Sequence, residues 1–355
     1  MKGIILHGGS GTRLRPLTYT DVKQLLPIAG KPVSEYALES LIELGISDIN
    51  IIVGEVGEKE VRQYYSDGSK WNVKISYTYQ GAPKGIAQAI GMTEDFVGED
   101  NFVVVLGDNY FQNGLTPAKE VFSHTKADAL VLLTVVDNPS QFGIATVENG
   151  RIVKIVEKPK KTSSNLAVTG AYFLRKSIFD IIRQLKPSWR DELEITEAFQ
   201  IMLDKGMKIE YSIIDGWWKD TGTVDEFLDC NRMVLDRIKR DVPTYISDSV
   251  VTGRVRMGSN VIIEGETKIL GPCYIGKNSR INNCYIGPFS SIGSDCIIEN
   301  TEIEDSVIMD GTSVQTSEGL RVTRSIIGPN TKITPSRSKS RTLRLVVGRD
   351  SLIEL

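Results

Sequence analysis

The C-terminal third of the chain carries aliphatic residues at a regular six-residue interval. Met257, Ile263, Ile269, Ile275 and Ile281 are each six residues apart. After a slip of one residue the interval resumes, and it continues after a second slip: Ile286, Ile292, Ile298, Ile303, Met309. Such a repeat puts an aliphatic side chain at the same point of each flat face of a coil, so that stacked coils form aliphatic ladders. Independent β-hairpins are the alternative, but five consecutive matches and two restarts favour stacked coils.

Glycine often follows the repeated aliphatic residue, as in Ile275-Gly276, Ile286-Gly287 and Ile292-Gly293. This pattern resembles the hexapeptide repeats of left-handed β-helix proteins. The resemblance implies a left-handed parallel β-helix domain over residues 242–355.

Residues 1–241 follow a different pattern, in which short apolar runs alternate with amphipathic stretches of helical length. The runs that read as strands are Lys2–Leu6, Ile49–Val53, Lys74–Tyr79, Phe102–Leu106, Ala129–Val136 and Ile209–Ile214. Helices are expected between them, at Val33–Leu44 and Gly85–Phe96, and a linker helix at Val224–Arg240 closes the domain. Alternation of strand and helix predicts an α/β fold with a doubly wound, Rossmann-like, mixed and mostly parallel sheet. Ligands of such sheets bind at the carboxyl ends of the strands.

Charge and cysteine content limit the class of protein. A net charge of −3 gives no reason to expect a nucleic acid or an anionic membrane as a partner. The four cysteines form no C-x-x-C pair, which argues against zinc and against a disulfide framework. No apolar run is long enough for a signal peptide or a membrane span, so a cytoplasmic protein is expected.

A glycine-rich loop follows the first strand directly. Gly8, Gly9 and Gly11 let backbone N–H groups approach an anion, and Arg13 can neutralise phosphate charge. The spacing is that of neither the dinucleotide fingerprint nor the Walker sequence. A structural glycine turn is the alternative, but Lys23 supplies a second cation a short loop away and favours a phosphate site.

Two carboxylates follow strands and could share a metal ion. Asp108 comes after Phe102–Leu106, and Asp220 precedes the linker helix. Each could instead serve as a turn or helix-cap residue. Mg²⁺ needs few protein carboxylates, because substrate oxygens and water complete its shell, so these two residues would suffice.

The stretch G-G-S-G-T-R-L-R-P-L-T, followed by K-Q-L-L-P-x-x-G-K-P, resembles the signature of nucleotidyltransferases that make sugar nucleotides. More narrowly, the chain resembles glucose-1-phosphate thymidylyltransferases, including longer members with an appended β-helix. The resemblance implies Mg²⁺-dependent transfer from dTTP to glucose-1-phosphate, giving dTDP-glucose and pyrophosphate. It also implies that Asp108 and Asp220 are the metal ligands.

The resemblance assigns roles to individual residues. Those expected to be catalytic are Arg13, Lys23 and Lys158. Those expected to bind nucleotide are Leu6, Gly8, Gly9, Gly11, Thr12, Gln80, Pro83, Gly85 and Asp108. Those expected to bind the sugar phosphate are Asn109, Gly143, Glu157, Lys158, Val168, Gly170, Tyr172 and Trp218. Arg190 and Glu192 also match, although a salt bridge explains them equally well. His7 departs from the family, which usually has Ala there, and this leaves the choice of nucleotide open.

Several alternatives remain open. UTP could replace dTTP, several sugars could be accepted, or the chain could be a non-catalytic regulatory subunit. The β-helix lacks the histidine base of acetyltransferase relatives, since His7 and His124 both lie in the first domain. The β-helix is therefore expected to serve oligomerisation or regulation, and a homo-oligomer, trimer or tetramer, is expected. Its basic C-terminal segment, which includes Arg337, Lys339, Arg341 and Arg344, is interpreted as a solvated strand edge.

Overall fold

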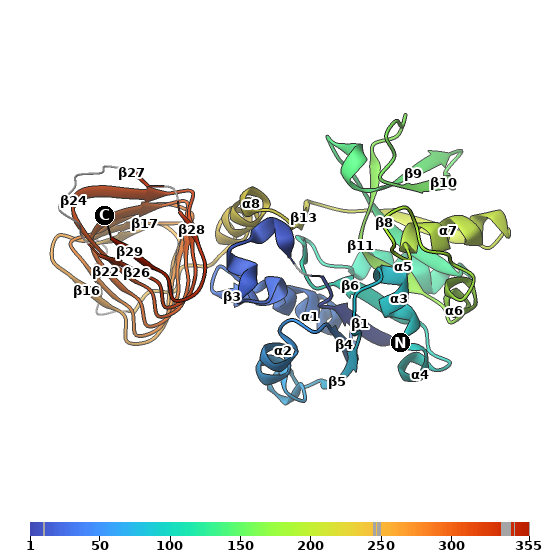
Figure 1. The fold of residues 1–355 in the computed structure, drawn as a ribbon, viewed down its shortest axis with the longest axis horizontal. Coiled ribbons are helices and arrows are strands. Elements are labelled where there is room, and N and C mark those ends of the chain that lie inside the picture. Colours follow the sequence, from blue (N-terminus) through green and yellow to red (C-terminus); the bar gives the residue numbers. More distant parts are fainter. Residues whose placement is uncertain (10, 244–245, 247–249, 335–341, 344, 355) are drawn as a thin grey trace. The chain divides into compact units, whose positions relative to one another are not determined.

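The computed structural model describes residues 1–9, 11–243, 246, 250–334, 342–343 and 345–354 (Figure 1). Contacts group the chain into two compact units. Unit 1 comprises Met1–Gly9 and Ser34–Asp220, and unit 2 comprises Ser10–Val33 and Thr221–Leu355. The segment after the first strand therefore groups with the C-terminal part of the chain. The domain boundary expected after residue 241 stays a prediction. Ser10 and the basic residues Arg337, Lys339, Arg341 and Arg344 lie outside the described residues.

Unit 1 is built on a nine-stranded sheet whose main path runs β10-β9-β11-β6-β1-β4-β5. Four strands at one end of this path are parallel: β1 (Lys2–Leu6), β4 (Asp48–Val53), β5 (Lys74–Tyr79) and β6 (Phe102–Leu106). They are the expected strands to within one residue. The Ile and Val residues of β1, β4 and β6 are almost fully buried, as strands covered on both faces require, whereas β5 at the edge of the sheet is only partly buried.

The other half of the sheet is mixed. It contains β8 (Ala129–Val135), β9 (Gly143–Glu148), β10 (Arg151–Glu157), β11 (Leu166–Leu174) and β12 (Ile209–Ile213). Strand β11 runs antiparallel to β6, β8 and β9, whereas β12 and β8 are parallel. The expected α/β class with a mixed sheet is confirmed, although β9, β10 and β11 were not expected individually.

Helices of unit 1 connect these strands: α1 (Val33–Glu43), α2 (Glu58–Tyr65), α3 (Ile86–Gly91), α4 (Glu94–Val97), α5 (Thr116–His124), α6 (Ser177–Ile182) and α7 (Ile195–Asp204). The single helix expected at Gly85–Phe96 is two helices. The break falls at Met92–Thr93, where the buried hydroxyl of Thr93 donates to the carbonyl of Ile90 at 2.7 Å. A side chain that bonds to the backbone in this way competes with helix continuation.

Unit 2 contains the parallel β-helix and the helix α8 (Val224–Leu235). The strands of the β-helix are β14 (Val251–Thr252), β15 (Val255–Met257), β16 (Ile262–Glu264), β17 (Lys268–Leu270), β18 (Cys273–Ile275), β19 (Arg280–Asn282), β20 (Tyr285–Ile286), β21 (Ser290–Ile292), β22 (Ile297–Glu304), β23 (Val307–Ile308), β24 (Ser313–Thr323), β25 (Ile326–Ile327), β26 (Lys332–Thr334), β27 (Thr342–Leu343), β28 (Val346–Val347) and β29 (Leu352–Glu354). Stacked strands of successive coils, in orange to red in Figure 1, pair in parallel.

The aliphatic ladder predicted from the repeat is present. On one face of the β-helix, the residues that pair between successive coils are Met257, Ile275, Ile292, Ile308, Ile327 and Val347. The prediction that Met309 belongs to the ladder is wrong by one position. Ile308 pairs with Ile292 instead, because the coil is one residue shorter there. Cys273, Cys284 and Cys296 are buried free thiols within this core.

Helix α8 begins after Thr223, whose hydroxyl accepts a bond from the amide of Glu226 at 3.3 Å. Thr223 is thus the N-cap, and the alternative that Asp220 caps this helix is wrong. Within the described part of the chain, every helix is too short or too polar to cross a lipid bilayer.

Candidate active site

One cavity of about 200 Å³ lies in unit 1. All eight residues expected to bind the sugar phosphate line it: Asn109, Gly143, Glu157, Lys158, Val168, Gly170, Tyr172 and Trp218. Asp220, Arg190 and Glu192 line it as well. These residues come from segments more than 100 positions apart in the sequence, and most of them lie just after β6, at the start of β9, at the end of β10 and in the middle of β11.

Asp108 is connected to this cavity through its neighbour. The side-chain amide of Asn109 donates to Asp108 Oδ1 at 2.7 Å, and Asn109 Oδ1 accepts a bond from Trp218 Nε1 at 2.6 Å. Gly170 makes room for this arrangement, since a Cβ there would lie 2.3 Å from Asn109 Oδ1. Hydrogen bonds therefore link the Trp218 indole to the Asn109 amide, and the Asn109 amide to the Asp108 carboxylate.

Asp220 is brought to the same place by a short antiparallel ladder. Strand β13 (Trp218–Asp220) pairs with β7 (Asn109–Phe111), and Asp220 stands opposite Asn109. Two carboxylates from neighbouring strands suit Mg²⁺, which binds through one or two carboxylates plus substrate phosphates. Among the described residues, no group of three or more His, Cys, Asp or Glu side chains could hold a metal. A dedicated all-protein metal cage is thus not what these residues form.

Glu157, the last residue of β10, is held between a hydroxyl and a cation. Its Oε2 accepts a bond from Thr196 Oγ1 at 2.9 Å, and its Oε1 lies 3.5 Å from Arg190 Nη1. Gly143 allows this approach, because a Cβ there would lie 2.4 Å from Thr196 Cγ2. Thr196 was not predicted, although it follows closely after Arg190 and Glu192, which matched the family.

Arg190 makes three ion pairs at the cavity wall. Besides Glu157, it pairs with Glu192 at 2.9 Å and with Glu194 at 3.3 Å. Burial and then the charge of Glu157 raise the pKa of Glu194 above its usual value. The salt-bridge interpretation of Arg190 and Glu192 is therefore realised in this structure. Burial also raises the pKa of Tyr172, which keeps its phenol neutral.

Lys158 follows Glu157 with a left-handed backbone, at φ 41°. A non-glycine residue rarely adopts this conformation, and such strain is concentrated at functional sites. The amide of Lys158 donates to the carbonyl of Phe142 at 3.0 Å, which holds the conformation. Its ammonium group lies 3.9 Å from Glu157 Oε1, so lysine and carboxylate sit at the same cavity wall.

The segment around Gln80, which is expected to bind nucleotide, is ordered by a pair of glutamines. Gln80 Nε2 donates to Gln88 Oε1 at 2.9 Å, and the amide of Lys84 donates to the same oxygen at 3.1 Å. Gln80 Oε1 is buried and has no hydrogen-bond partner in the described structure. A Cβ on Gly8 would lie 2.6 Å from this oxygen. The glycine therefore lets the amide lie against the loop that follows β1.

Gly85 lies where two segments of unit 1 touch. Its φ is +102°, and a Cβ there would lie 2.5 Å from the carbonyl oxygen of Leu193. Backbone bonds join the segments on both sides, from Leu193 N to Lys84 O at 2.7 Å and from Ala87 N to Leu193 O at 3.1 Å. Pro83, in the same loop, is exposed.

His7 is packed rather than hydrogen-bonded. Both ring nitrogens are buried without a partner among the described residues, and the ring meets Tyr65 edge-on at 5.7 Å. Burial lowers the pKa of His7 to about 3, against an opposing effect of Asp108. The imidazole is thus neutral at physiological pH. Leu6, one residue earlier, is buried at the end of β1, and Gly9 has φ +106° with open space at its Cβ position.

The remaining phosphate-binding candidates belong to unit 2. Gly11 (φ +58°) precedes the 3-10 turn Thr12–Leu14, and its carbonyl accepts a bond from Thr18 Oγ1 at 2.7 Å. Arg13 is exposed within that turn, and its guanidinium lies next to Gly222. A Cβ on Gly222 would lie 2.7 Å from Arg13 Nη2. Lys23 is largely buried and begins the 3-10 turn Lys23–Leu25.

Comparisons with known proteins agree with this geometry. The model of the nucleotidyl transferase family matches residues 2–237, and a model described as the GMPPB C-terminal domain matches residues 269–350. The chain belongs to the nucleotidyl transferase family.

Individual relatives are more specific. The chain is 39% identical over 358 residues to a glucose-1-phosphate thymidylyltransferase of Streptomyces antibioticus, covering 100% of this chain and 99% of the relative. It is 45% identical over 262 residues to a low-salt glycan biosynthesis nucleotidyltransferase of Haloferax volcanii, covering 73% of each chain. A solved Bacillus anthracis structure, assigned as a glucose-1-phosphate thymidylyltransferase, superimposes with a TM-score of 0.64 at 41% identity and covers 68% of this chain and 98% of its own.

Proposed function

We propose that the chain transfers a thymidylyl group from dTTP to glucose-1-phosphate, giving dTDP-glucose and pyrophosphate. The observation that carries this proposal is the cavity of unit 1, which collects the eight residues expected to bind a sugar phosphate beside Asp220 and the Asn109–Asp108 pair. The full-length similarity to a named glucose-1-phosphate thymidylyltransferase supports the choice of substrates.

The reaction is an in-line displacement at phosphorus. A phosphate oxygen of glucose-1-phosphate attacks the α-phosphorus of dTTP, the new P–O bond forms, and the bond to the β-phosphate oxygen breaks to release pyrophosphate. The nucleophile is already an anion at neutral pH, so no general base is needed. Positioning and charge neutralisation must then supply the catalysis.

Each cation has a defined task in this proposal. Arg13 and Lys23 stabilise the triphosphate and the leaving pyrophosphate, and Lys158 holds the phosphate of the sugar substrate. Glu157 accepts bonds from sugar hydroxyl groups. Mg²⁺ bound by Asp108 and Asp220 would supply positive charge to the phosphate oxygens.

Gln80 and the backbone of Gly8 and Gly85 form the proposed base and ribose site. An amide offers a donor and an acceptor, which matches the Watson–Crick edge of thymine or uracil. Gln88 engages one of the two N–H donors of the Gln80 amide, so the second N–H and Oε1, which has no partner among the described residues, are the groups proposed to meet the base. The cytoplasmic location and the homo-oligomer expected from the sequence stay predictions.

A panel of substrates tests the proposal. Pyrophosphate release is measured for dTTP, UTP, GTP, CTP and ATP, each with glucose-, mannose- or N-acetylglucosamine-1-phosphate. The highest kcat/KM is expected for dTTP with glucose-1-phosphate. A higher value for UTP would make the chain a uridylyltransferase, and no release with any pair would favour a regulatory subunit.

A further inference from the structure

The segment that carries Arg13 and Lys23 is anchored to the β-helix. Its hairpin, β2 (Pro27–Ile28) and β3 (Lys31–Pro32), turns at Ala29 and Gly30. Both turn residues are in the left-handed region, with φ 48° and 80°. An alanine rarely takes this conformation unless its surroundings hold it there.

Three side chains of unit 2 hold the turn. Asn231 Oδ1 accepts a bond from the amide of Ala29 at 2.9 Å, and Arg256 Nη2 donates to the carbonyl of Ala29 at 2.7 Å. The Tyr274 ring lies directly against Gly30, where a Cβ would be 2.1 Å from two ring carbons. We call Asn231, Arg256 and Tyr274 the turn socket. Only glycine fits at position 30.

The turn socket is itself tied to the β-helix. Asn231 is on α8, and its Oδ1 also accepts a bond from Ser291 Oγ at 2.8 Å, while its Nδ2 donates to the carbonyl of Phe289 at 3.2 Å. The guanidinium of Arg256 stacks over the Tyr274 ring at 5.1 Å. A single buried amide therefore joins the turn, α8 and two β-helix residues.

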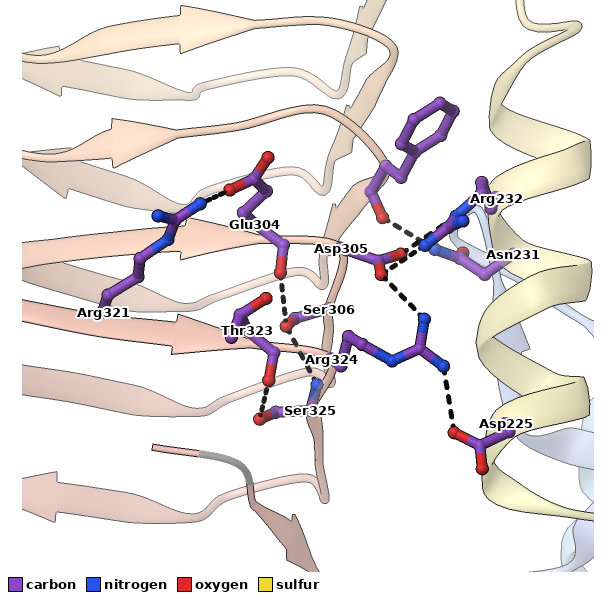
Figure 2. Close-up of polar contacts among 11 residues, drawn as sticks. Asp225, Asn231, Arg232, Glu304, Asp305, Ser306, Arg321, Thr323, Arg324 and Ser325 are labelled. Carbon is purple, nitrogen blue, oxygen red and sulfur yellow. Dashed lines mark hydrogen bonds and ion pairs between the residues drawn. The ribbon is translucent and has the colours of Figure 1, made fainter. Parts of the chain in front are cut away.

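Figure 2 shows that an ion-pair chain fixes α8 along the β-helix beside Asn231. Arg232 Nε donates to Asp305 Oδ1 at 3.3 Å. Arg324 lies 3.5 Å from the same carboxylate, and it donates to Asp225 at 3.0 Å, on the first turn of α8. Both ends of the helix are thus held by β-helix side chains.

The segment has a second anchor at the other end of the β-helix. Asp21, two residues before Lys23, pairs with Arg349 of the last coil. A Cβ on Gly348 would lie 3.3 Å from the carbonyl oxygen of Pro16. Residues 16–30 are therefore held at both ends by β-helix residues, by Arg349 at one end and by Arg256 and Tyr274 at the other.

We propose that the β-helix is the positioning element of the phosphate-binding segment, and that Asn231, Arg256 and Tyr274 are positioning residues for nucleotidyl transfer. The inference rests on the proposed function. It adds that the socket, which contacts no reacting atom, sets where Arg13 and Lys23 present their charges. A displacement of about 1 Å is enough to cost about 100-fold in rate.

The test combines hydrogen exchange with kinetics in the full chain. The turn-socket variants are Tyr274→Ala, Asn231→Ala and Arg256→Ala. The control is Arg280→Ala, which removes an exposed β-helix arginine that is paired with Glu264. We expect faster amide hydrogen exchange at residues 11–26 in the three socket variants, and unchanged exchange in β1, β4 and β6. The KM for dTTP rises by about tenfold and kcat falls by about tenfold, while the KM for glucose-1-phosphate stays within about twofold. Arg280→Ala matches the wild type.

A merely structural role would lower kcat through loss of active protein and leave both KM values unchanged, which would overturn the inference. Unchanged exchange at residues 11–26 in Tyr274→Ala and Asn231→Ala would overturn it as well. Exchange needs no substrate, so failure of the two proposals can be told apart. Faster exchange at residues 11–26 in a chain without thymidylyl transfer would support the anchoring and refute the proposed function.

A steric pair gives a second measurement. Gly30→Ala collides with the Tyr274 ring, and Tyr274→Ala removes the collision. The double variant is expected to bind dTTP better than Gly30→Ala alone, although the left-handed backbone at residue 30 still disfavours alanine. Strictly additive losses in the double variant would contradict contact between the ring and the turn.

Discussion

The side chain of Asn109 donates a hydrogen bond of 2.7 Å to the carboxylate of Asp108 and accepts one from Trp218. The amide thus sets the direction of a proposed metal ligand while it lines the proposed sugar cavity. Groups that orient a metal ligand typically matter by 10–100-fold in metal affinity or activity.

Asn109→Ala is therefore expected to raise the Mg²⁺ concentration needed for half-maximal rate, and to lower kcat/KM by about 10- to 100-fold. Pyrophosphate release over a Mg²⁺ titration measures both quantities. Asn113→Ala is the matched control, because the Asn113 amide instead donates to the exposed Asp215 at 3.1 Å. An unchanged Mg²⁺ dependence in Asn109→Ala would contradict the orienting role.

Removal of either charge at the proposed reaction centre should abolish most of the rate without unfolding the chain. Asp108→Asn and Arg13→Ala are each expected to lower turnover by about 100-fold or more, because catalysis here consists of charge neutralisation. Circular dichroism checks the fold, and Asp137→Asn, at an exposed position, serves as the control. Near-normal pyrophosphate release from either active-site variant would refute the assignment.

Gly170→Ala tests how closely the cavity wall is packed. The added Cβ would lie 2.3 Å from Asn109 Oδ1 and 2.9 Å from Leu106 Cδ1, so Asn109 and Trp218 must move. The KM for glucose-1-phosphate is expected to rise by about tenfold. Gly91→Ala is the control, since a Cβ in helix α3 meets only a methyl group of Ile182 at 3.1 Å. Equal kinetics in the two variants would count against the proposed sugar site.

His7 makes a prediction about pH. Its pKa is about 3 in the folded chain and about 6.5 when unfolded, so the unfolded state binds the extra proton between these values. The stability that His7 contributes is present above pH 6.5 and is lost as the pH falls toward 3, by about 1.4 kcal/mol per pH unit.

Urea unfolding at pH 7.5 and at pH 5.0 measures this effect. The wild type should lose roughly 2 kcal/mol more than His7→Ala over this interval. His124→Ala, which removes an exposed ring bonded to the carbonyl of Glu120, should behave as the wild type. Parallel pH profiles of the wild type and His7→Ala would show that the ring is not buried neutral.

Periodic features were the most predictable part of the fold. Strands β1 and β6 match their expected bounds because continuous apolar runs identify buried parallel strands, and the partly buried β5 matches its bounds as well. The six-residue repeat predicted the ladder down to individual residues, and failed at Met309 where a coil shortens by one residue. Strands β9 and β10 were missed because they are partly exposed and pair antiparallel, and the buried β11 was missed because Thr169 and Gly170 interrupt its apolar run.

The site residues were predicted from the family signature, but the contacts that hold these residues in place could not be predicted. The resemblance selected Glu157 and Lys158, but no periodicity marks Thr196, whose hydroxyl holds Glu157. The turn socket was also missed, since Asn231 and Arg256 are ordinary polar residues in the sequence. Their roles arise only when the chain brings residue 29 to helix α8 and the first coils.

In the proposed reaction, this chain exchanges the pyrophosphate of dTTP for glucose-1-phosphate. The most direct measurement counts both products when the purified chain is incubated with dTTP, glucose-1-phosphate and Mg²⁺. Equal amounts of pyrophosphate and dTDP-glucose are expected, and both products are expected to be lost when Asp220→Asn replaces the wild type. Pyrophosphate formed without dTDP-glucose, or neither product formed by the wild type, would contradict the proposed reaction.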